Sequence, residues 1–342
     1  MVSWIRRAGP RHRFEYRDAN DRVIRDRRTL MRIDALRVPP AWRDVHIARS
    51  PRSAIQAWGF DARGRKQYRY HARAVERREL RKHHRVRQLA KELPHLRRAM
   101  EHDARPSASA SALDVDTVAA TVLRLISETF CRVGGERYLR ENGTFGITTL
   151  RKSHVRVSAG AARLVYRGKG KIWQRQVVTD RALVRLIARQ LRTPGSRVFA
   201  YKRGADWRTL RARDVNSYLQ RRAGRGHYSA KDFRTWGATL RAATVLAELG
   251  AARSETEARR NVALAMRLVS SELGNTPAIC RASYVHPMVI ARYLDDGETI
   301  SLSAARRAAR IRGRAHSPEE RALIAFLERH FPERRRSVRR DV

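Results

Sequence analysis

Acidic residues are scarce in this sequence, and lysines are scarcer still. Its 342 residues include 33 Asp and Glu against 75 Lys and Arg, which gives a formal net charge of +42. Soluble enzymes that act on small molecules rarely carry such an excess, so the composition indicates a polyanionic partner, with nucleic acid as the leading candidate. Only eight of the basic residues are lysine. The arginine excess fits a GC-rich genome as well as bidentate phosphate binding, and it makes a lysine between two glycines conspicuous.

Cysteines and long apolar runs are also missing. Cys131 and Cys280 are the two cysteines of the chain, too few for a disulfide framework. No stretch approaches the roughly 20 apolar residues of a membrane span, and the N-terminus lacks the apolar core of a signal peptide. We therefore expect a cytoplasmic, nucleoid-associated protein without membrane contact. The histidines and cysteines show no metal-ligand spacing, so neither a metal nor a cofactor is expected.

Hydrophobic patterning divides the chain into two folded parts and a tail. Residues 1–75 contain short alternating segments, including a hairpin of 13–16 with 23–25, and predict a small β-rich N-terminal domain. Residues 76–331 have mainly helical periodicity and predict a larger, mainly helical domain. Residues 332–342 are basic and are predicted to be disordered. The expected fold class is therefore α+β.

The helical part contains one predicted sheet. Pro94 is expected to break or kink the first long helical segment. Asn142-Gly143 is a strong turn signal, and helix is expected again after Asp180. Three short strands are predicted between these points: 144–150, 163–167 and 172–178.

Capping residues set the predicted helix starts, at Asp114 or Asp116, Ser229, Ser254, Thr276 and Ser317. The helix that Ser229 opens is expected to run to Leu249, with Gly250 as its stop, and its apolar stripe places Arg234 away from the core, toward the rim. The helix that begins at Thr276-Pro277 is expected to carry Tyr284 about two turns in.

Four residues have distinctive neighbours. Arg132 lies in Phe-Cys-Arg-Val-Gly-Gly, and Lys169 lies in Gly-Lys-Gly-Lys between two predicted strands. Arg234 lies in Lys-Asp-Phe-Arg-Thr-Trp-Gly, and Tyr284 follows Gly-Asn-Thr-Pro by a few residues. An arginine, a loop lysine, a second arginine and a tyrosine, in that order, suit phosphodiester cleavage by a tyrosine nucleophile.

At this point the chain resembles the type IB DNA topoisomerases of the small bacterial and poxvirus-like kind, over nearly its whole length. Each matching segment alone is weak, but five in order over some 250 residues are specific. They are RVPPAW at 37–42, GRKQYRY at 64–70, YLRENGTFG at 138–146 within the run 132–154, KDFRTWG at 231–237, and 275–284.

The resemblance implies a role for each candidate residue. Tyr284 attacks a phosphodiester and forms a 3′-phosphotyrosyl link. Arg132 and Arg234 bind the non-bridging oxygens, and Lys169 is the general acid toward the leaving 5′ oxygen. The family often has His where Asn275 stands, and the Asn amide can still donate a hydrogen bond to phosphate but cannot titrate.

The same resemblance implies a mainly helical, tyrosine recombinase-like catalytic domain that, with the N-terminal sheet, clamps duplex DNA. The partner is supercoiled double-stranded DNA, and we expect a monomer with no obligate protein partner. The implied DNA contacts are Gln67, Tyr68, Tyr70, Arg137, Tyr138 and Lys231.

Elementary chemistry agrees with these roles. A phenol of pKa about 10 is a poor nucleophile at neutral pH, and nearby guanidinium groups favour its phenolate. A tyrosyl phosphodiester retains the energy of the bond it replaces, so religation needs no ATP. With arginines at the phosphate, no metal is required.

Other interpretations were weighed against this one. The Gly-Lys-Gly-Lys segment lacks the phosphate-loop frame, because Ile172 follows where that frame has Ser or Thr. Tyr293 is a rival nucleophile, but acidic neighbours favour a structural role. A tyrosine recombinase is the nearest alternative function, although it typically has His at the position of Lys231 and a helical N-terminal domain. A non-catalytic DNA-compacting protein would also carry this charge.

Overall fold

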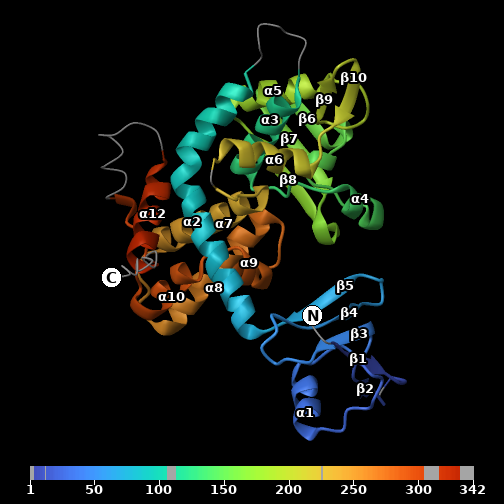
Figure 1. Ribbon diagram of the computed structural model, residues 1–342. Helices are drawn as coiled ribbons and strands as arrows, with labels where there is room; N and C mark the ends of the chain where they lie inside the picture. The colour runs from blue at the N-terminus through green and yellow to red at the C-terminus, as the bar shows by residue number, and fades with distance from the viewer. Residues whose placement is uncertain (1–3, 12, 106–112, 225, 304–315, 332–342) are drawn as a thin grey trace, which may run out of the picture. The chain divides into compact units, whose positions relative to one another are not determined.

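The computed structural model describes residues 4–11, 13–105, 113–224, 226–303 and 316–331 (Figure 1). It divides into two compact units, Met1–Lys82 and His83–Val342. The predicted basic tail, 332–342, lies outside the described residues. The mixed architecture confirms the expected α+β class.

The N-terminal unit is built on one antiparallel sheet with strand order β2-β1-β3-β4-β5. One face buries Ile5, Val45, Ile47 and Ala57 against Ile33 of a single helix. The elements are β1 (Trp4–Ala8), β2 (Glu15–Arg17), α1 (Arg27–Ala35), β3 (Arg43–Ala48), β4 (Ile55–Phe60) and β5 (Lys66–Tyr70). The predicted small β-sheet is confirmed.

The predicted hairpin of 13–16 with 23–25 is confirmed in part. The Ile24 N–H donates to the Tyr16 carbonyl at 2.8 Å beside an antiparallel bridge of Arg17 with Val23, but β2 pairs along its length with β1. The chain then enters α1, because Asp26 accepts the backbone N–H of Thr29 at 2.8 Å and so caps a helix. Neither β1 nor α1 was predicted.

The larger unit is mainly helical. Its central helices, α3 and α7, are buried over most of their length. The helices are α2 (Ala72–Asp103, whose first residues belong to the N-terminal unit), α3 (Val115–Thr129), α4 (Glu136–Asn142), α5 (Arg181–Leu191), α6 (Ala212–Arg222), α7 (Ala230–Leu249), α8 (Glu255–Leu273), α9 (Pro277–Ser283), α10 (Pro287–Asp296) and α12 (Pro318–His330).

Most predicted helix starts are confirmed. Asp114 accepts the N–H of Thr117, Ser254 that of Glu257, and Ser229 forms a reciprocal cap with Asp232. Pro94, in contrast, does not end a helix: α2 continues through it. Leu93 and Leu96 are both buried on either side of Pro94, so tertiary packing offsets the hydrogen bond that proline cannot donate.

A three-stranded antiparallel sheet with order β6-β7-β8 lies beside α3 and α5 (Figure 1). Its strands are β6 (Val155–Ser158), β7 (Ala161–Arg167) and β8 (Trp173–Val178). The second and third predicted strands are confirmed. A further hairpin, β9 (Ala200–Arg203) with β10 (Asp206–Thr209), interrupts the stretch expected to be helical after Asp180.

The first predicted strand of this sheet, 144–150, is wrong. It is a loop around a 3₁₀ turn, η1 (Ile147–Thr149). The N–H groups of Ile147 and Thr148 donate to the carbonyls of Arg132 and Val133, at 2.9 and 2.8 Å. These bonds tie the loop to the segment after α3 and leave no pattern for a strand ladder.

Within the described part of the chain, no helix is both long and apolar enough to cross a bilayer.

Candidate active site

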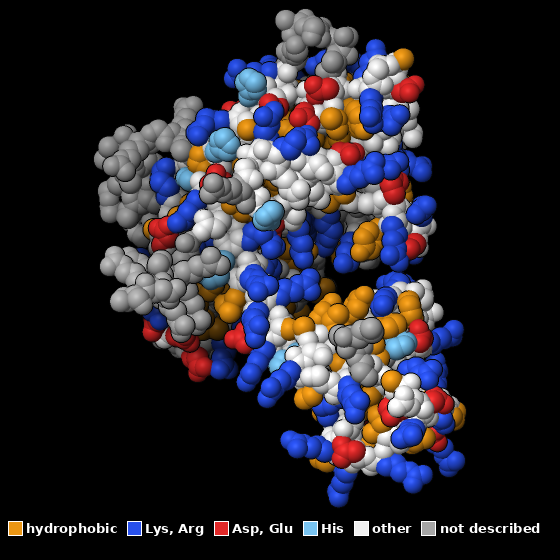
Figure 2. All heavy atoms as spheres, viewed as in Figure 1, with side chains coloured by type: hydrophobic (Ala, Val, Ile, Leu, Met, Phe, Trp, Pro, Cys, Tyr) orange, Lys and Arg blue, Asp and Glu red, His pale blue; other side chains and the backbone are white. Residues whose placement is uncertain are grey.

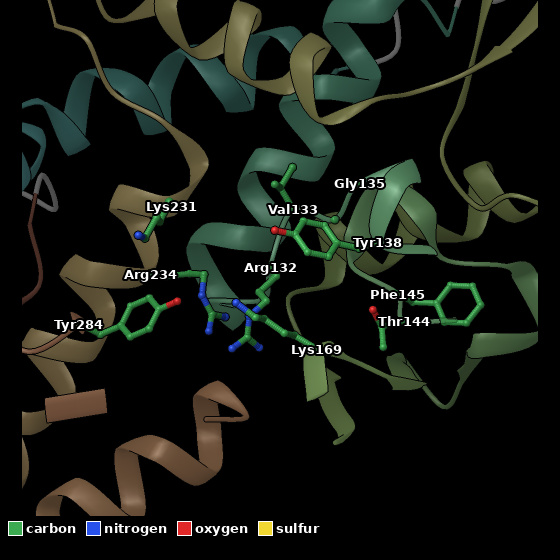
Figure 3. Close-up of a pocket in the computed structure, with 11 residues that line it drawn as sticks. Arg132, Val133, Gly135, Tyr138, Thr144, Phe145, Lys169, Lys231, Arg234 and Tyr284 are labelled. Atoms are coloured by element: carbon green, nitrogen blue, oxygen red, sulfur yellow. The ribbon is translucent and has the colours of Figure 1, made fainter. Parts of the chain in front are cut away.

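One pocket of about 280 Å³ gathers the four residues singled out in the sequence (Figure 3). Its wall comes from the end of α3, the start of α4, the β7–β8 turn, α7 and the end of α9. The lining residues are Arg132, Val133, Gly134, Gly135, Tyr138, Thr144, Phe145, Lys169, Lys231, Arg234 and Tyr284.

Arg132 reaches the pocket because α3 ends sharply. Phe130, its C-cap, has φ 51°, a left-handed conformation that turns the chain out of the helix. The Arg132 guanidinium donates to the carbonyls of Leu273 and Gly274, at 3.4 and 3.3 Å. These carbonyls form the C-terminal end of α8, where unpaired C=O groups and the helix dipole favour a cation.

Arg234 is buried in α7, with 2% of its surface exposed. The prediction that it lies at the rim is therefore wrong. That prediction assumed one apolar face, whereas residues 232–239 of α7 are all buried. The guanidinium donates to the carbonyl of Leu273 at 3.1 Å and to that of Phe130. Backbone oxygens thus compensate for its burial.

Burial is the main cause that lowers the pKa of Arg234, and repulsion from Arg132 adds to it. The two guanidinium groups lie close together despite their mutual repulsion. Both donate hydrogen bonds to the Leu273 carbonyl, which helps to hold them there. Such a pair is a preformed site for an anion with several oxygens.

Tyr284 stands just after a helix and not within one. α9 ends at Ser283, and Tyr284 is its C-cap, with φ −125°. Tyr284 does lie about two turns after the helix start at Pro277, as expected, but the helix ends one residue before it. Pro287 explains the early end, because the residue before a proline is driven from helical to extended backbone, and His286 has ψ 125°.

The hydroxyl of Tyr284 points toward the arginines (Figure 3). Burial acts to raise the pKa of Tyr284, but the charges of Arg234, Arg132 and Lys231 outweigh it, so the pKa is lowered below 10. The Arg234 Cζ lies 5.3 Å from the ring centroid, and the Lys231 Nζ lies 6.0 Å from it.

Lys169 occupies the turn between β7 and β8, as predicted. The N–H of Gly168 donates to the carbonyl of Ile172 at 2.8 Å and closes the turn. Gly170 has φ 73°, which glycine adopts without strain. The Lys169 side chain is exposed, and no carboxylate among the described residues forms an ion pair with it. Its ammonium group is therefore available to a ligand.

Asn275 lies behind Arg132 and does not line the pocket. Its Oδ1 accepts a hydrogen bond from Arg132, while its backbone N–H donates to the Ser270 carbonyl at 2.9 Å. The Nδ2 group is buried and has no hydrogen-bond partner in the described structure. Asn275 therefore orients Arg132, and its Nδ2 amide remains a hydrogen-bond donor without a partner in the described structure.

The expected DNA contacts fall into two groups. In the larger unit, Tyr138 and Lys231 line the pocket, whereas Arg137 is exposed on α4 and pairs with Glu141 at 2.7 Å. The others lie on β5 of the N-terminal unit, where the Tyr68 and Tyr70 rings stack with centroids 5.7 Å apart. The Gln67 amide donates to Asp61 at 2.9 Å.

Sequence reasoning missed the backbone that supports the site. Thr239, buried in α7, bonds the carbonyl of Tyr284 at 3.2 Å and the N–H of His286 at 3.1 Å. Nothing in the local sequence marks this threonine. Gly134 and Gly146 lie so close that a Cβ on Gly146 would be 2.4 Å from the Gly134 Cα. Here the glycines themselves were a sequence signal, because glycine allows two backbone segments to approach closely.

In the described ranges, no cluster of three or more His, Cys, Asp or Glu residues could hold a metal ion.

Comparison with known proteins points to one family for both units. Residues 66–308 match the model of the eukaryotic DNA topoisomerase I catalytic core, and residues 13–61 match that of the bacterial DNA topoisomerase IB N-terminal domain. The chain is 32% identical over 302 residues to DNA topoisomerase 1B of Acanthamoeba polyphaga mimivirus, covering 85% of this chain and 87% of that one.

Among solved structures, the site-specific recombinase XerH bound to its palindromic difH substrate is similar at 14% identity, with a TM-score of 0.38. That match covers 60% of this chain and 51% of the recombinase, so this chain spans about half of its length. The two family models and the viral relative, in contrast, account for nearly the whole sequence, and the chain belongs to the type IB DNA topoisomerases.

Proposed function

We propose that this enzyme relaxes positive and negative supercoils by cutting one strand through Tyr284 and resealing it, without ATP or a required metal. The observation that carries the proposal is the meeting of Tyr284, Arg132, Arg234 and Lys169 in one pocket. They come from four separate segments of the chain.

The first step is attack by the Tyr284 oxygen on a DNA phosphorus. The lowered pKa of Tyr284 increases the phenolate fraction at neutral pH, and the causes that lower it are the nearby cations. The Tyr284 oxygen becomes bonded to the 3′ phosphate, and the 5′ oxygen of the next nucleotide leaves.

Charge builds on the non-bridging oxygens during this step. Arg132 and Arg234 are already held at the pocket by the α8 carbonyls, so little reorganisation is needed when the phosphate enters. The unpaired Nδ2 of Asn275 supplies a further donor if Arg132 shifts toward the phosphate. This role requires hydrogen bonding but no titration.

The leaving 5′ oxygen needs a proton, and Lys169 is the proposed donor. Its ammonium group is exposed on a turn at the pocket wall and free of acidic partners in the described structure. On religation the neutral amine takes the proton back from the 5′ hydroxyl, which attacks the phosphotyrosine. The bond energy is conserved, so no ATP is consumed.

The proposed partner is supercoiled duplex DNA, held by both units as a clamp and bound by the enzyme as a monomer. Lys and Arg side chains are spread over the visible face of each unit (Figure 2). Tyr68, Tyr70 and Gln67 provide contacts from the N-terminal unit, and Arg137, Tyr138 and Lys231 provide them near the pocket. We propose a cytoplasmic, nucleoid-associated location on the same grounds.

The decisive experiment is plasmid relaxation without ATP and with EDTA, run beside a denaturing gel for the covalent adduct. Tyr284→Phe removes one oxygen, so it is expected to bind DNA normally but to give neither relaxation nor adduct. Tyr293→Phe is the control. The Tyr293 side chain is 1% exposed, and its hydroxyl donates to the Gly250 carbonyl at 2.8 Å, so it cannot reach DNA.

Relaxation by Tyr284→Phe, or activity only after metal is added, would refute the mechanism. A 5′-phosphotyrosyl adduct would refute the polarity. Site-specific strand exchange between two duplexes, with no relaxation of a plasmid, would favour the recombinase alternative. DNA binding that compacts the plasmid without any adduct would favour the compacting protein.

A further inference from the structure

The side chain of Gln174 fills the space between Gly168 and Gly274, two glycines that each directly precede a candidate site residue. It lies on β8 opposite Tyr166 of β7 and is 5% exposed. A Cβ added at Gly168 would lie 2.8 Å from the Gln174 Cγ, and one added at Gly274 would lie 1.9 Å from its Nε2. The glutamine thus occupies the volume that a side chain at either position would need.

One glycine adjoins the proposed proton donor, and the other adjoins the proposed phosphate-binding residues. Gly168 directly precedes Lys169, the proposed proton donor. Gly274 accepts a hydrogen bond from Arg132 at 3.3 Å and directly precedes Asn275. Gln174 is therefore wedged between the turn that delivers the proton and the helix end that holds the phosphate-binding arginines.

A second glutamine strengthens the connection. Side chains alternate along a strand, so Gln176 projects to the same side of β8 as Gln174. Its Nε2 donates to the carbonyl of Glu272, at the end of α8, with a distance of 3.2 Å. Two side chains of β8 thus dock the hairpin onto the last residues of α8.

The position of Lys169 depends on this docking. Its long side chain has no ionic partner among the described residues, so the base of the turn sets where the ammonium group can reach. That base is held by backbone bonds, from Gly168 N–H to Ile172 and from Phe145 N–H to Arg167, both at 2.8 Å. These bonds shape the turn but do not relate it to α8.

We propose that Gln174 is a positioning residue that sets the distance between Lys169 and the phosphate bound by Arg132 and Arg234. The proposal rests on the proposed role of Lys169 as general acid. Gln174 acts by filling space, because the hydrogen bond from its side-chain amide to the Trp173 carbonyl is long, at 3.4 Å. Truncation leaves a gap bordered by two glycines, which offer no side chain to fill it.

The test compares single-turnover cleavage of a normal strand with that of a strand carrying a 5′-bridging sulfur, which leaves without a proton. Gln174→Ala is expected to slow the normal strand by about 10²-fold, the order produced by a misplacement of about 1 Å. It is expected to leave the sulfur substrate nearly unaffected. Lys169→Ala is measured in parallel and should show the same selectivity.

Two further variants separate positioning from folding. Gln174→Met keeps the length and volume of the side chain, so it is expected to cleave the normal strand close to the unsubstituted rate. Gln190→Ala truncates another buried glutamine, on α5, whose Oε1 accepts the Ala200 N–H at 3.2 Å. It should slow neither substrate selectively. The Gln174→Ala, Lys169→Ala double variant should be no slower than Lys169→Ala alone.

The proposal for Gln174 would be overturned if Gln174→Ala slowed both substrates equally, or if the rate losses of the two single variants added up in the double variant. Selective slowing by Lys169→Ala would still support the proposed function. Unchanged cleavage of both substrates by Gln174→Ala overturns the proposal for Gln174 as well. If Lys169→Ala itself slows both substrates equally, the general acid lies elsewhere, and the role of Gln174 falls with it.

Discussion

Arg234 donates a hydrogen bond to the backbone carbonyl of Leu273, 3.1 Å away, from a side chain that is almost wholly buried. Arg132 reaches the same carbonyl at 3.4 Å. The C-terminus of α8 therefore organises both arginines before any DNA is present. This explains how two like charges stay side by side, and why their geometry depends on residues that never meet the phosphate.

Arg234→Lys is expected to lose most of the cleavage rate while retaining the positive charge. A lysine ammonium cannot reproduce the planar guanidinium that spans from Phe130 to Leu273. Loss of one oxyanion donor typically costs about 10²–10³-fold in rate. Single-turnover cleavage measures it, with DNA affinity as the control. A near-normal rate in Arg234→Lys would show that charge alone is sufficient.

Gly237→Ala is expected to disturb the same arginine from the other side. A Cβ at residue 237 would lie 2.2 Å from the Phe130 ring, so the ring has to move. The Phe130 carbonyl, which accepts from Arg234, moves with it. We expect slower cleavage and lower thermal stability. Gly250→Ala is not a suitable control because of its φ of 76°, whereas Ala263→Gly, at an exposed position of α8, tests helix propensity alone.

Sequence patterns predicted the elements whose signals are local. The Gly-Lys-Gly turn, the caps at Asp114, Ser229 and Ser254, and the order of the site residues were all readable along the chain. Patterns failed where a distant partner decides. Residues 147–149 form a turn because the segment after α3 takes their hydrogen bonds, and Arg234 is buried because backbone carbonyls from elsewhere satisfy it.

The ionisation of Tyr284 should depend on its cationic neighbours. Its pKa is lowered below that of a free phenol, so the phenolate should appear at lower pH than in the unfolded chain. Arg132→Gln removes one of the causes and should raise this pKa. The measurement is a difference in ultraviolet titration between each protein and its Tyr284→Phe counterpart. Identical titrations with and without Arg132 would contradict the assignment.

The same shift has a consequence for stability, with a definite sign. A group whose pKa is lowered by folding stabilises the folded state above its unfolded pKa, about 10 for tyrosine, and loses that contribution as pH falls through the folded value. The free energy of unfolding of the unsubstituted protein should therefore rise relative to that of Tyr284→Phe only in alkaline solution. A difference that grows toward acidic pH would have the wrong sign.

DNA affinity should fall steeply with salt. With 75 basic residues against 33 acidic ones, phosphate contacts are expected to dominate binding. About 6–10 such contacts would reduce affinity by roughly 10³–10⁵ between 50 and 200 mM salt. Tyr284→Phe serves as the binding species, because it cannot form an adduct. An affinity independent of salt would contradict a phosphate-dominated interface.

Thr239→Val tests whether the backbone contacts of Thr239 position Tyr284 for cleavage, in addition to stabilising α7. The Thr239 hydroxyl accepts the N–H of His286 and shares its one proton between the carbonyls of Thr235 and Tyr284, at 2.8 and 3.2 Å, so it contacts the backbone on both sides of Val285. Valine has nearly the same shape but leaves that buried N–H unpaired, which costs about 1–3 kcal/mol. We expect a destabilised protein that also cleaves more slowly, because the Tyr284 hydroxyl is no longer held at the arginines.

Thr244→Val is the matched control for this variant. Thr244 lies on the same helix, is 9% exposed, and bonds the Leu240 carbonyl at 3.0 Å. Its loss should affect stability slightly and single-turnover cleavage not at all. Measured below the unfolding temperature of both variants, normal cleavage by Thr239→Val would show that Tyr284 is positioned by its cationic neighbours alone. Slow cleavage confined to Thr239→Val would show that the backbone behind the nucleophile is part of the catalytic arrangement.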